Sequence, residues 1–254
     1  MEQSTYEKIV SKKEFSNLPK EDIEKIYSLY EKRQTSEEEK IKLTRDMLRK
    51  VYSAFSSSKV LNSNILNKKS AEEILKKHIS TRERFEIYEE LYFKLIKEDC
   101  TILDLGAGIN GLSYNYFPKK VNYIGVEAVG QMVELMNEYF KKEKISSAFA
   151  IKDSLFNYEN MSNLIKKEKG KKIIFLFKAL DSLEMVERNS SKELLEKIVP
   201  LADEVVVSFA TKSLISRKPF RVKRYWFENF LKDKNWKILE DFELGSERYI
   251  RFRK

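Results

Sequence analysis

The side chains best suited to ligand chemistry gather around one glycine turn. The stretch "TILDLGAGING" (101–111) joins an apolar run to two glycines, Gly106 and Gly108, that flank Ala107. Glycine lacks a Cβ, so the backbone at these positions can pass close to a ligand. Asp104 precedes the glycines, where a carboxylate disfavours a pyrophosphate and suits a cofactor that carries an ammonium group. A turn of this kind is weak evidence by itself, and an ordinary tight turn is the alternative.

Two further acids follow the next two predicted strands. Glu127 ends "NYIGVE", roughly twenty residues after the turn, where an acid of a nucleotide-binding α/β fold accepts hydrogen bonds from ribose hydroxyls. Asp153 and Ser154 follow "AFAIK", and Asp153 could accept from an adenine amino group; a helix N-cap or turn is its alternative role. A dinucleotide site would more usually read G-x-G-x-x-G. Because S-adenosylmethionine carries an ammonium group and NAD does not, the pattern favours S-adenosylmethionine.

The segment after the fourth predicted strand, "FLFKALDSLE" (175–184), would face the transferred methyl group. We expect Phe177 and Lys178 there, with Ser208 beside them at the end of the fifth strand. The chain lacks the N/D-P-P-Y/F string of exocyclic-amine methyltransferases. Its single cysteine, Cys100, precedes the first strand, away from the position of a C5-pyrimidine nucleophile. Two kinds of methyl acceptor remain. One is an atom such as guanine N7, whose methylation needs alignment and no general base; the other is a group that another base must activate.

A basic stretch follows the fifth predicted strand. Residues 211–227, "TKSLISRKPFRVKRYWF", contain no acid, and Phe220, Tyr225 and Trp226 interleave with the cations. Basic side chains among aromatic ones suit phosphate contact and base stacking, which predicts RNA binding. The alternative is a solvated basic loop whose aromatic residues pack beneath it. The predicted RNA-binding residues are Lys212, Arg217, Lys218, Arg221, Lys223 and Arg224.

Two regions position these residues. Residues 1–98 contain no glycine and carry apolar stripes at helical spacing, such as Ile23, Ile26, Tyr27 and Tyr30, so we expect a helical N-terminal domain that docks on RNA. Residues 99–254 alternate short apolar runs with amphipathic stretches and end in two strand-like runs joined by "GS". This is an α/β pattern, typical of a class I, Rossmann-like methyltransferase domain with a C-terminal β-hairpin.

Composition limits the remaining classes. A net charge of +9 with 35% charged residues favours an anionic partner, although a generally lysine-rich composition would give the same excess. One cysteine permits no intrachain disulfide, and one histidine without a cysteine cluster predicts no metal site. The apolar run "IIFLF" (173–177) is too short to span a bilayer, and the first residues lack a signal-peptide pattern. We expect a cytoplasmic monomer without membrane contact.

Several motifs resemble one known family. They are "HISTRERF" (78–85), "ILDLGAGINGL" (102–112), "FLFKALDSLE" (175–184), "VVVSFATKSL" (205–214), "YWFENF" (225–230) and "ELGSERYI" (243–250). In this order they are similar to the aminoglycoside-resistance 16S ribosomal RNA (guanine-N7) methyltransferases, which modify a decoding-site guanine. The resemblance covers roughly the last 180 residues. It implies S-adenosylmethionine as cofactor and the small ribosomal subunit as partner.

The resemblance also gives Arg84 a role. In the family, the arginine that ends H-x-S-T-x-E-R contacts the methionine carboxylate, which a guanidinium fork suits. The alternative is a surface pair of Arg84 with Glu83 or Glu86, and His78 is expected to cap or pack the segment. Gly111 stands where the family has proline, and Glu127 where it has aspartate.

Residues 215–224 replace a glycine-rich stretch of the family, which leaves the target nucleotide open. One alternative keeps the methyltransferase activity on another rRNA position, on tRNA or on a small molecule. A second is a non-catalytic RNA-binding or assembly factor with a degenerate methyltransferase fold.

Overall fold

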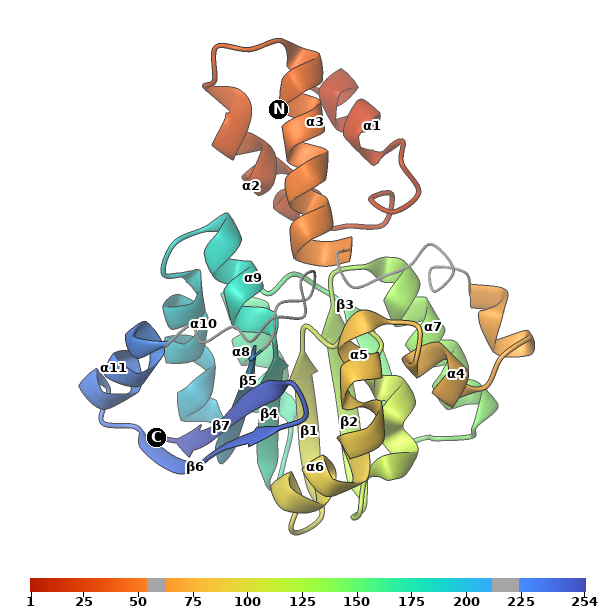
Figure 1. Cartoon of the computed structure of the whole chain (residues 1–254), viewed down its shortest axis with the longest axis vertical. Coiled ribbons are helices and arrows are strands. Elements are labelled where there is room, and N and C mark those ends of the chain that lie inside the picture. Colours follow the sequence, from red (N-terminus) through yellow and green to blue (C-terminus); the bar gives the residue numbers. More distant parts are fainter. Residues whose placement is uncertain (54–62, 212–223) are drawn as a thin grey trace.

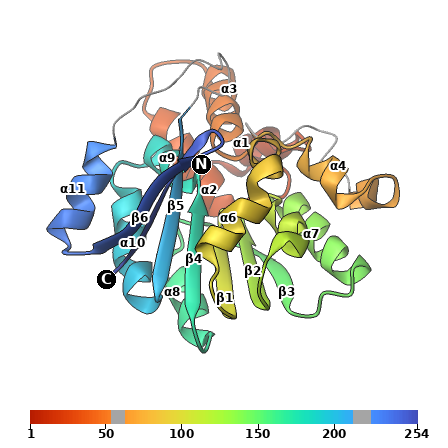
Figure 2. The same ribbon diagram turned by 60° about the horizontal axis from the view of Figure 1, so that its bottom comes forward.

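The computed structural model describes residues 1–53, 63–211 and 224–254. Within them, one sheet has the strand order β3-β2-β1-β4-β5-β7-β6 (Figure 1). Its strands are β1 (Cys100–Leu105), β2 (Val121–Glu127), β3 (Ala148–Lys152), β4 (Lys172–Phe177), β5 (Glu204–Ala210), β6 (Lys237–Leu244) and β7 (Glu247–Arg253). Strands β1 to β5 are parallel, whereas β7 is antiparallel to β5 and forms a hairpin with β6 (Figure 2). The predicted parallel sheet with a C-terminal hairpin is confirmed.

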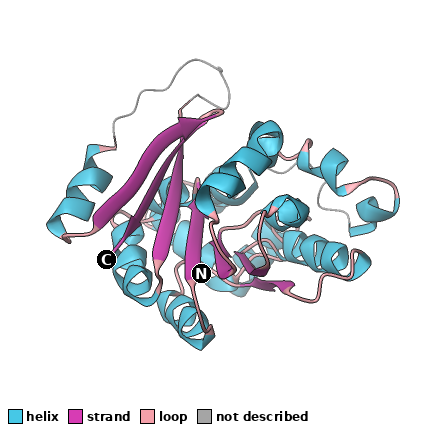
Figure 3. Ribbon diagram, turned by 90° about the horizontal axis from the view of Figure 1, so that it is seen from below, coloured by secondary structure: helices cyan, strands magenta, loops and turns pink. Residues whose placement is uncertain are grey.

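Helices lie on both faces of the sheet (Figure 3). They are α4 (Ala71–Leu75), α5 (Ile79–Arg84), α6 (Tyr88–Leu95), α7 (Gly130–Lys142), α8 (Tyr158–Lys167), α9 (Ala179–Val186), α10 (Ser190–Ile198) and α11 (Tyr225–Asp233). Side chains alternate between the faces of a strand, and the buried residues accordingly form two cores. Ile102 of β1 shares the first core with α4, α6 and α7, whereas Leu103 and Leu105 share the second with α8 to α11.

Three further helices form the N-terminal lobe, which we define as residues 3–53. They are α1 (Gln3–Val10), α2 (Lys20–Glu31) and α3 (Glu37–Leu48), followed by a π-helical turn, Arg49–Ser53. The lobe lies apart from the sheet layers, at the top of Figure 1. The predicted stripe of Ile23, Ile26, Tyr27 and Tyr30 on α2 is buried, and its apolar contacts are continuous with the first core.

The helical region predicted over residues 1–98 thus divides into two parts. Its later helices pack on the sheet, since the Tyr92 ring of α6 stacks on Phe175 of β4 with the centroids 6.3 Å apart. The proposed boundary at 98/99 falls between α6 and β1, whose buried side chains share the first core. No helix in the three described ranges is long and apolar enough to cross a membrane.

Candidate active site

A cleft opens at the carboxyl ends of β1, β2 and β4, and the predicted glycine turn forms its floor. Gly106 and Gly108 line it with φ angles of +77° and +57°, which favour glycine. A Cβ on Gly108 would lie 3.5 Å from Cε1 of His78, so the turn passes directly beneath the histidine ring. Ala107, between the glycines, also lines the cleft. The turn predicted from the sequence is therefore the floor of a concave site.

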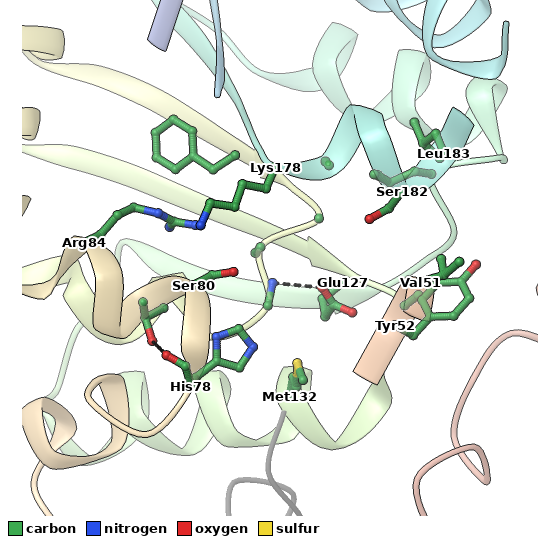
Figure 4. Close-up of a pocket in the computed structure, with 18 of the residues that line it drawn as sticks. Val51, Tyr52, His78, Ser80, Arg84, Glu127, Met132, Lys178, Ser182 and Leu183 are labelled. Carbon is green, nitrogen blue, oxygen red and sulfur yellow. Dashed lines mark hydrogen bonds between the residues drawn. The ribbon is translucent and has the colours of Figure 1, made fainter. Parts of the chain in front are cut away.

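Glu127 lies at the middle of the cleft (Figure 4). Its Oε2 atom accepts a hydrogen bond of 2.8 Å from the backbone N–H of Gly108, and its Oε1 atom accepts one of 2.9 Å from Val129. Burial raises the pKa of this carboxyl, and the backbone donors act in the opposite direction. A carboxylate has about four lone-pair positions, so two bonds leave it able to accept more. The position predicted for a ribose-binding acid is thus on the cleft.

Two cations lie together at one end of the cleft, Arg84 from α5 and Lys178 from the end of β4 (Figure 4). Arg84 donates from Nε to Oε1 of Glu247 at 2.9 Å and from Nη1 to Oδ1 of Asn110 at 2.9 Å. The Arg84 side chain is 4% exposed, so the alternative of a surface pair with Glu83 or Glu86 is wrong. Within the described residues, Nη2 of Arg84 has no hydrogen-bond partner, which leaves one face of the fork for a ligand.

Lys178 joins the same buried charge cluster. Its Nζ atom lies 3.1 Å from Oε1 of Glu247 and also bonds Glu83. Its backbone is left-handed, with φ of +58°, which costs a lysine roughly 1–3 kcal/mol. The backbone N–H of Lys178 donates to Ser208 on the neighbouring strand. The strained residue lies where the chain leaves β4, and its side chain lines the cleft.

Glu247, on β7, stands between the two cations. It is 1% exposed and also accepts from the Ser208 hydroxyl. Burial raises the pKa of this carboxyl, but attraction to Arg84 and Lys178 and the bonds from Ser208 and Arg84 outweigh burial, and the pKa is lowered. We predicted Ser208 beside Phe177 and Lys178 in the methyl-transfer pocket. It is not among the residues that line the cleft, and its hydroxyl bonds Glu247 and the backbone of Lys178.

The opposite end of the cleft is apolar and aromatic. Val51, Tyr52 and Leu183 lie there, and Met132, Leu155 and Phe156 also line the cleft. Figure 4 places Tyr52 across the cleft from Arg84, with Glu127 between them. The cleft thus changes along its length from a cationic end to an apolar, aromatic end.

Besides Ser208, three more predicted residues lie outside the cleft lining. Asp104 is beneath the turn, where its Oδ2 accepts bonds of 2.8 Å from Asn110 and 2.8 Å from Tyr123, so it supports the turn and reaches Arg84 through Asn110. Asp153 accepts from its neighbour Ser154 at 2.8 Å and from Asn160 at 3.0 Å, which is the predicted alternative of a turn residue. Ser154 is buried and donates to Asp22.

The basic stretch is described only in part. Lys212, Arg217, Lys218, Arg221 and Lys223 lie outside the described residues. Arg224 is 6% exposed; its Nη2 lies 2.5 Å from Oδ2 of Asp181, and its guanidinium lies 5.0 Å from the Phe209 ring centroid. Arg224 is therefore buried at the start of α11, unlike a residue of an exposed RNA-binding surface. Phe227 is buried, whereas Tyr225 is 56% exposed.

A Cβ on Gly111 would lie 2.8 Å from Cζ of Phe140 and 3.0 Å from Sδ of Met136, so the packing of α7 requires the glycine that stands in place of proline. His78 is the N-cap residue of α5, and burial, followed by the charges of Arg84 and Lys178, lowers its pKa to about 3. Within the described ranges, no three His, Cys, Asp or Glu side chains gather as metal ligands.

The sequence reasoning missed Glu247, Asn110, Glu83 and Tyr52. A signal existed for Glu247, because it begins the last predicted strand. Antiparallel pairing of β7 with β5 places Glu247 opposite Ala210, at the edge where the parallel strands end. Glu83 and Asn110 lie within the motifs "HISTRERF" and "ILDLGAGINGL", but neither was given a role, and Tyr52 carried no sequence signal for a site.

Comparison with known proteins identifies the family of the chain. A profile of the family described as ribosomal RNA methyltransferase (FmrO) matches residues 62–250. The chain is 25% identical over 186 residues to the 16S rRNA (guanine(1405)-N(7))-methyltransferase of Proteus mirabilis, which covers 70% of this chain and 63% of that protein. The chain therefore spans less than two thirds of the length of this curated relative.

Solved structures share the fold over nearly the whole chain. The 16S rRNA methyltransferase RmtF, in complex with S-adenosyl-L-homocysteine, matches with a TM-score of 0.83 and 22% identity, covering 100% of this chain and 99% of that one. An rRNA methylase from Escherichia coli matches with a TM-score of 0.77 and 17% identity, covering 99% and 98%. At these identities the likeness establishes the fold, including the N-terminal lobe, while the profile match establishes the family. The chain belongs to the FmrO family of ribosomal RNA methyltransferases.

Proposed function

We propose that this protein is an S-adenosylmethionine-dependent methyltransferase that modifies guanine N7 in the 16S rRNA of the small ribosomal subunit. The observation that carries the proposal is the cleft on the glycine turn, with buried Arg84 and Lys178 at one end, Glu127 in the middle and an apolar wall at the other. The family membership and the relative that modifies guanine N7 support the choice of substrate.

The residues of the cleft fit S-adenosylmethionine in order. Arg84 suits the carboxylate, since its Nη2 atom is left over by Glu247 and Asn110. Glu127 suits the ribose hydroxyls, and Met132, Leu155 and Phe156 suit the adenine ring. The backbone of Gly106 and Gly108 lets the ligand approach closely. When bound, this cofactor supplies an electrophilic methyl group on a sulfonium.

Ionisable side chains near the cleft are held in ways that suit a reaction without a general base. His78 is buried with a pKa lowered to about 3, and Glu247 is shared between two cations. Glu83 bonds Lys178, and Asp104 lies beneath the turn. Guanine N7 has a free lone pair and no proton to lose, so alignment is what the site must provide. Phe177 and Lys178, which line the cleft at the end of β4, are the residues proposed to border the target base.

The target RNA is proposed to reach the cleft across the segment after β5. That strand ends at Ala210, at the same edge of the sheet as the glycine turn, and the basic residues from Lys212 to Lys223 follow it. Cations in this segment can pair with phosphates, while the cleft receives one base. If the modified base is the decoding-site guanine of the relative, the expected consequence is resistance to aminoglycosides.

The deciding experiment is methylation with labelled S-adenosylmethionine, offered separately with small subunits, naked 16S rRNA and tRNA, followed by mapping of the labelled nucleotide. Label on a 16S rRNA guanine N7 is the expected result. Label on another nucleotide would retain the enzyme class and move the target, which the altered segment 215–224 would explain. No label on any RNA, with cofactor binding intact, would favour the small-molecule or non-catalytic alternatives.

A matched pair of variants ties the activity to the cleft. Arg84→Ala removes the cation that faces the proposed carboxylate. The affinity for S-adenosylhomocysteine, measured by calorimetry, should fall by at least about 30-fold, which corresponds to the free energy of one hydrogen bond to a charged group. Arg82→Ala removes an exposed arginine of the same helix that does not line the cleft, and should leave affinity unchanged. Equal affinity of both variants would remove Arg84 from the proposed site.

A further inference from the structure

The N-terminal lobe reaches the cleft through one short segment. Val51 and Tyr52 line the cleft and belong to the π-helical turn Arg49–Ser53 that ends the lobe. They lie across from the glycine turn, on the apolar side of the cleft (Figure 4). π-Helical turns are rare and occur frequently at functional sites. The wall at this end is therefore built in part from a lobe that is separate from the sheet.

A single carboxylate fixes the position of this wall. Asp22 of α2 is 2% exposed, and its Oδ2 atom accepts a hydrogen bond of 2.7 Å from the Tyr52 hydroxyl. Its Oδ1 atom accepts from the hydroxyl of Ser154, which follows β3. The Ser154 oxygen in turn accepts from the backbone N–H of Phe156 at 3.1 Å, and Phe156 also lines the cleft. Asp22 thus connects two parts of the cleft wall that come from different layers.

The burial of this carboxylate makes the connection energetically important. A buried carboxylate is tolerated when hydrogen bonds compensate for its lost hydration. Here one donor, Tyr52, belongs to the lobe, and the other, Ser154, belongs to the sheet side, so the Ser154 bond joins lobe and sheet. Other contacts hold the lobe at the same place. Gln131 donates to the carbonyl of Lys13 at 3.0 Å, and Lys25 pairs with Glu187 at 2.6 Å. Moving the lobe away would break these bonds and open the apolar end of the cleft.

We propose that the N-terminal lobe contributes to the cofactor site. In this site Tyr52 forms the wall at the apolar end, and Asp22 is the positioning residue that fixes the Tyr52 ring. Cofactor binding and docking of the lobe then stabilise each other, because linkage between two equilibria is reciprocal. The inference rests on the proposed function. It adds that the fraction of molecules with the lobe docked over the cleft is highest when cofactor is bound.

Cofactor affinity tests the wall. S-adenosylhomocysteine is titrated in a calorimeter into the full chain and its variants. Tyr52→Ala, which removes the ring, should weaken binding at least ten-fold, by loss of a buried aromatic contact. Tyr52→Phe keeps the ring and loses the bond to Asp22, so about a five-fold loss is expected. Tyr30→Phe is the matched control, since Tyr30 is a buried tyrosine of α2 outside the cleft, and its affinity should equal that of the wild type.

Hydrogen exchange tests the reciprocal effect. Adding S-adenosylhomocysteine should slow amide exchange in residues 20–31 and 49–53 of the wild type, and Asp22→Ala should abolish that slowing. The double variant of Asp22→Ala with Tyr52→Phe should bind no more weakly than Asp22→Ala alone, because the two residues act as one unit. A purely structural role of Asp22 would lower the melting temperature and leave both the ligand affinity and the exchange response intact.

The outcomes separate this inference from the proposed function. Failure of the wild type to bind S-adenosylhomocysteine would overturn both. Binding that depends on Arg84 but is the same within two-fold for Tyr52→Ala, Tyr52→Phe and wild type would keep the proposed function and overturn the role of the lobe. Tyr52→Phe keeps the test valid if Tyr52→Ala fails to fold.

Discussion

Arg84 and Glu247 stand 163 residues apart in the chain, yet Nε of Arg84 lies 2.9 Å from Oε1 of Glu247, with both side chains buried. The pair links the short helix α5 to the C-terminal hairpin, next to Lys178. Without Glu247, Lys178 would keep Glu83, whereas Arg84 would have no carboxylate within ion-pair distance among the described residues. The hairpin therefore supplies the counter-charge that lets a cationic ligand site exist inside the protein.

Replacing Glu247 by glutamine should cost about 3 kcal/mol of unfolding free energy near neutral pH, because it leaves Arg84 and Lys178 undercompensated. The pKa of Glu247 is lowered from 4.5. A carboxyl with a lowered pKa stabilises the fold above its unfolded pKa and loses that effect as pH falls through its folded pKa. The difference between wild type and Glu247→Gln should thus be constant above about pH 5 and shrink below that, measured by urea unfolding.

The control is Glu39→Gln, which breaks an exposed pair with Lys42 and should change the unfolding free energy by less than about 1 kcal/mol. A Glu247→Gln protein as stable as the wild type at neutral pH would show that the buried cluster tolerates the loss of its anion.

His78 should remain neutral throughout the physiological range. It is the only histidine of the chain, so its imidazole resonances need no assignment. With a pKa lowered to about 3 by burial and by Arg84 and Lys178, these resonances should not shift between pH 8 and pH 5 in the folded protein, and should titrate near 6.5 in urea. A midpoint near 6.5 in the folded protein would contradict the burial of this ring.

The same shift affects stability in a defined direction. A histidine whose folded pKa is lowered lets the unfolded chain take up a proton that the folded chain refuses, so stability falls as pH drops below 6.5. The loss should approach about 1.4 kcal/mol per pH unit from this group. His78→Gln should remove this component, which urea unfolding of both proteins at pH 7 and near pH 5 would measure.

The sequence predicted the features that local patterns determine. Apolar runs gave all the strands, and the positions of Gly106, Gly108 and Glu127 at strand ends placed them on the cleft, because parallel strands end at one edge. Asp104 has an equally local signal, but its side chain lies beneath the turn, where Asn110 and Tyr123 bond it. Strand position alone does not tell which face of a turn a side chain takes.

The missed residues depend on contacts between distant parts of the chain. Tyr52 meets Asp22 across 30 residues, and Ser154 meets Asp22 across 132. Their residue types are ordinary for helices and turns, and their role appears once the lobe is docked over the sheet. Arg224 is the opposite case. Its position in a basic run predicted a contact with RNA at the surface, but its side chain is buried in an ion pair with Asp181.

Gly111→Ala should destabilise the protein by about 1–3 kcal/mol, the usual cost of an overpacked core, because the added Cβ meets Phe140 at 2.8 Å and Met136 at 3.0 Å. Adding Phe140→Leu should recover part of this loss, so the double variant is more stable than the sum of the single changes predicts. Chemical unfolding measures all three. Gly170→Asn is the control, since nothing lies within 4 Å of its Cβ position and asparagine tolerates a positive φ. Additive costs would show that Phe140 is not the obstacle.

Changing Arg221 to glutamine should affect RNA binding, whereas changing Arg224 to glutamine should affect the stability of the fold. Arg221 belongs to the proposed RNA segment, so its loss should lower the salt dependence of rRNA binding by about 0.7–0.9 in log–log slope. Arg224 is buried against Asp181 and Phe209, so its loss should lower the melting temperature and leave the salt slope unchanged. Fluorescence anisotropy over a salt series and a thermal melt measure the two effects. A reduced salt slope for Arg224→Gln with an unchanged melting temperature would show that Arg224 contacts RNA and contradict its structural role.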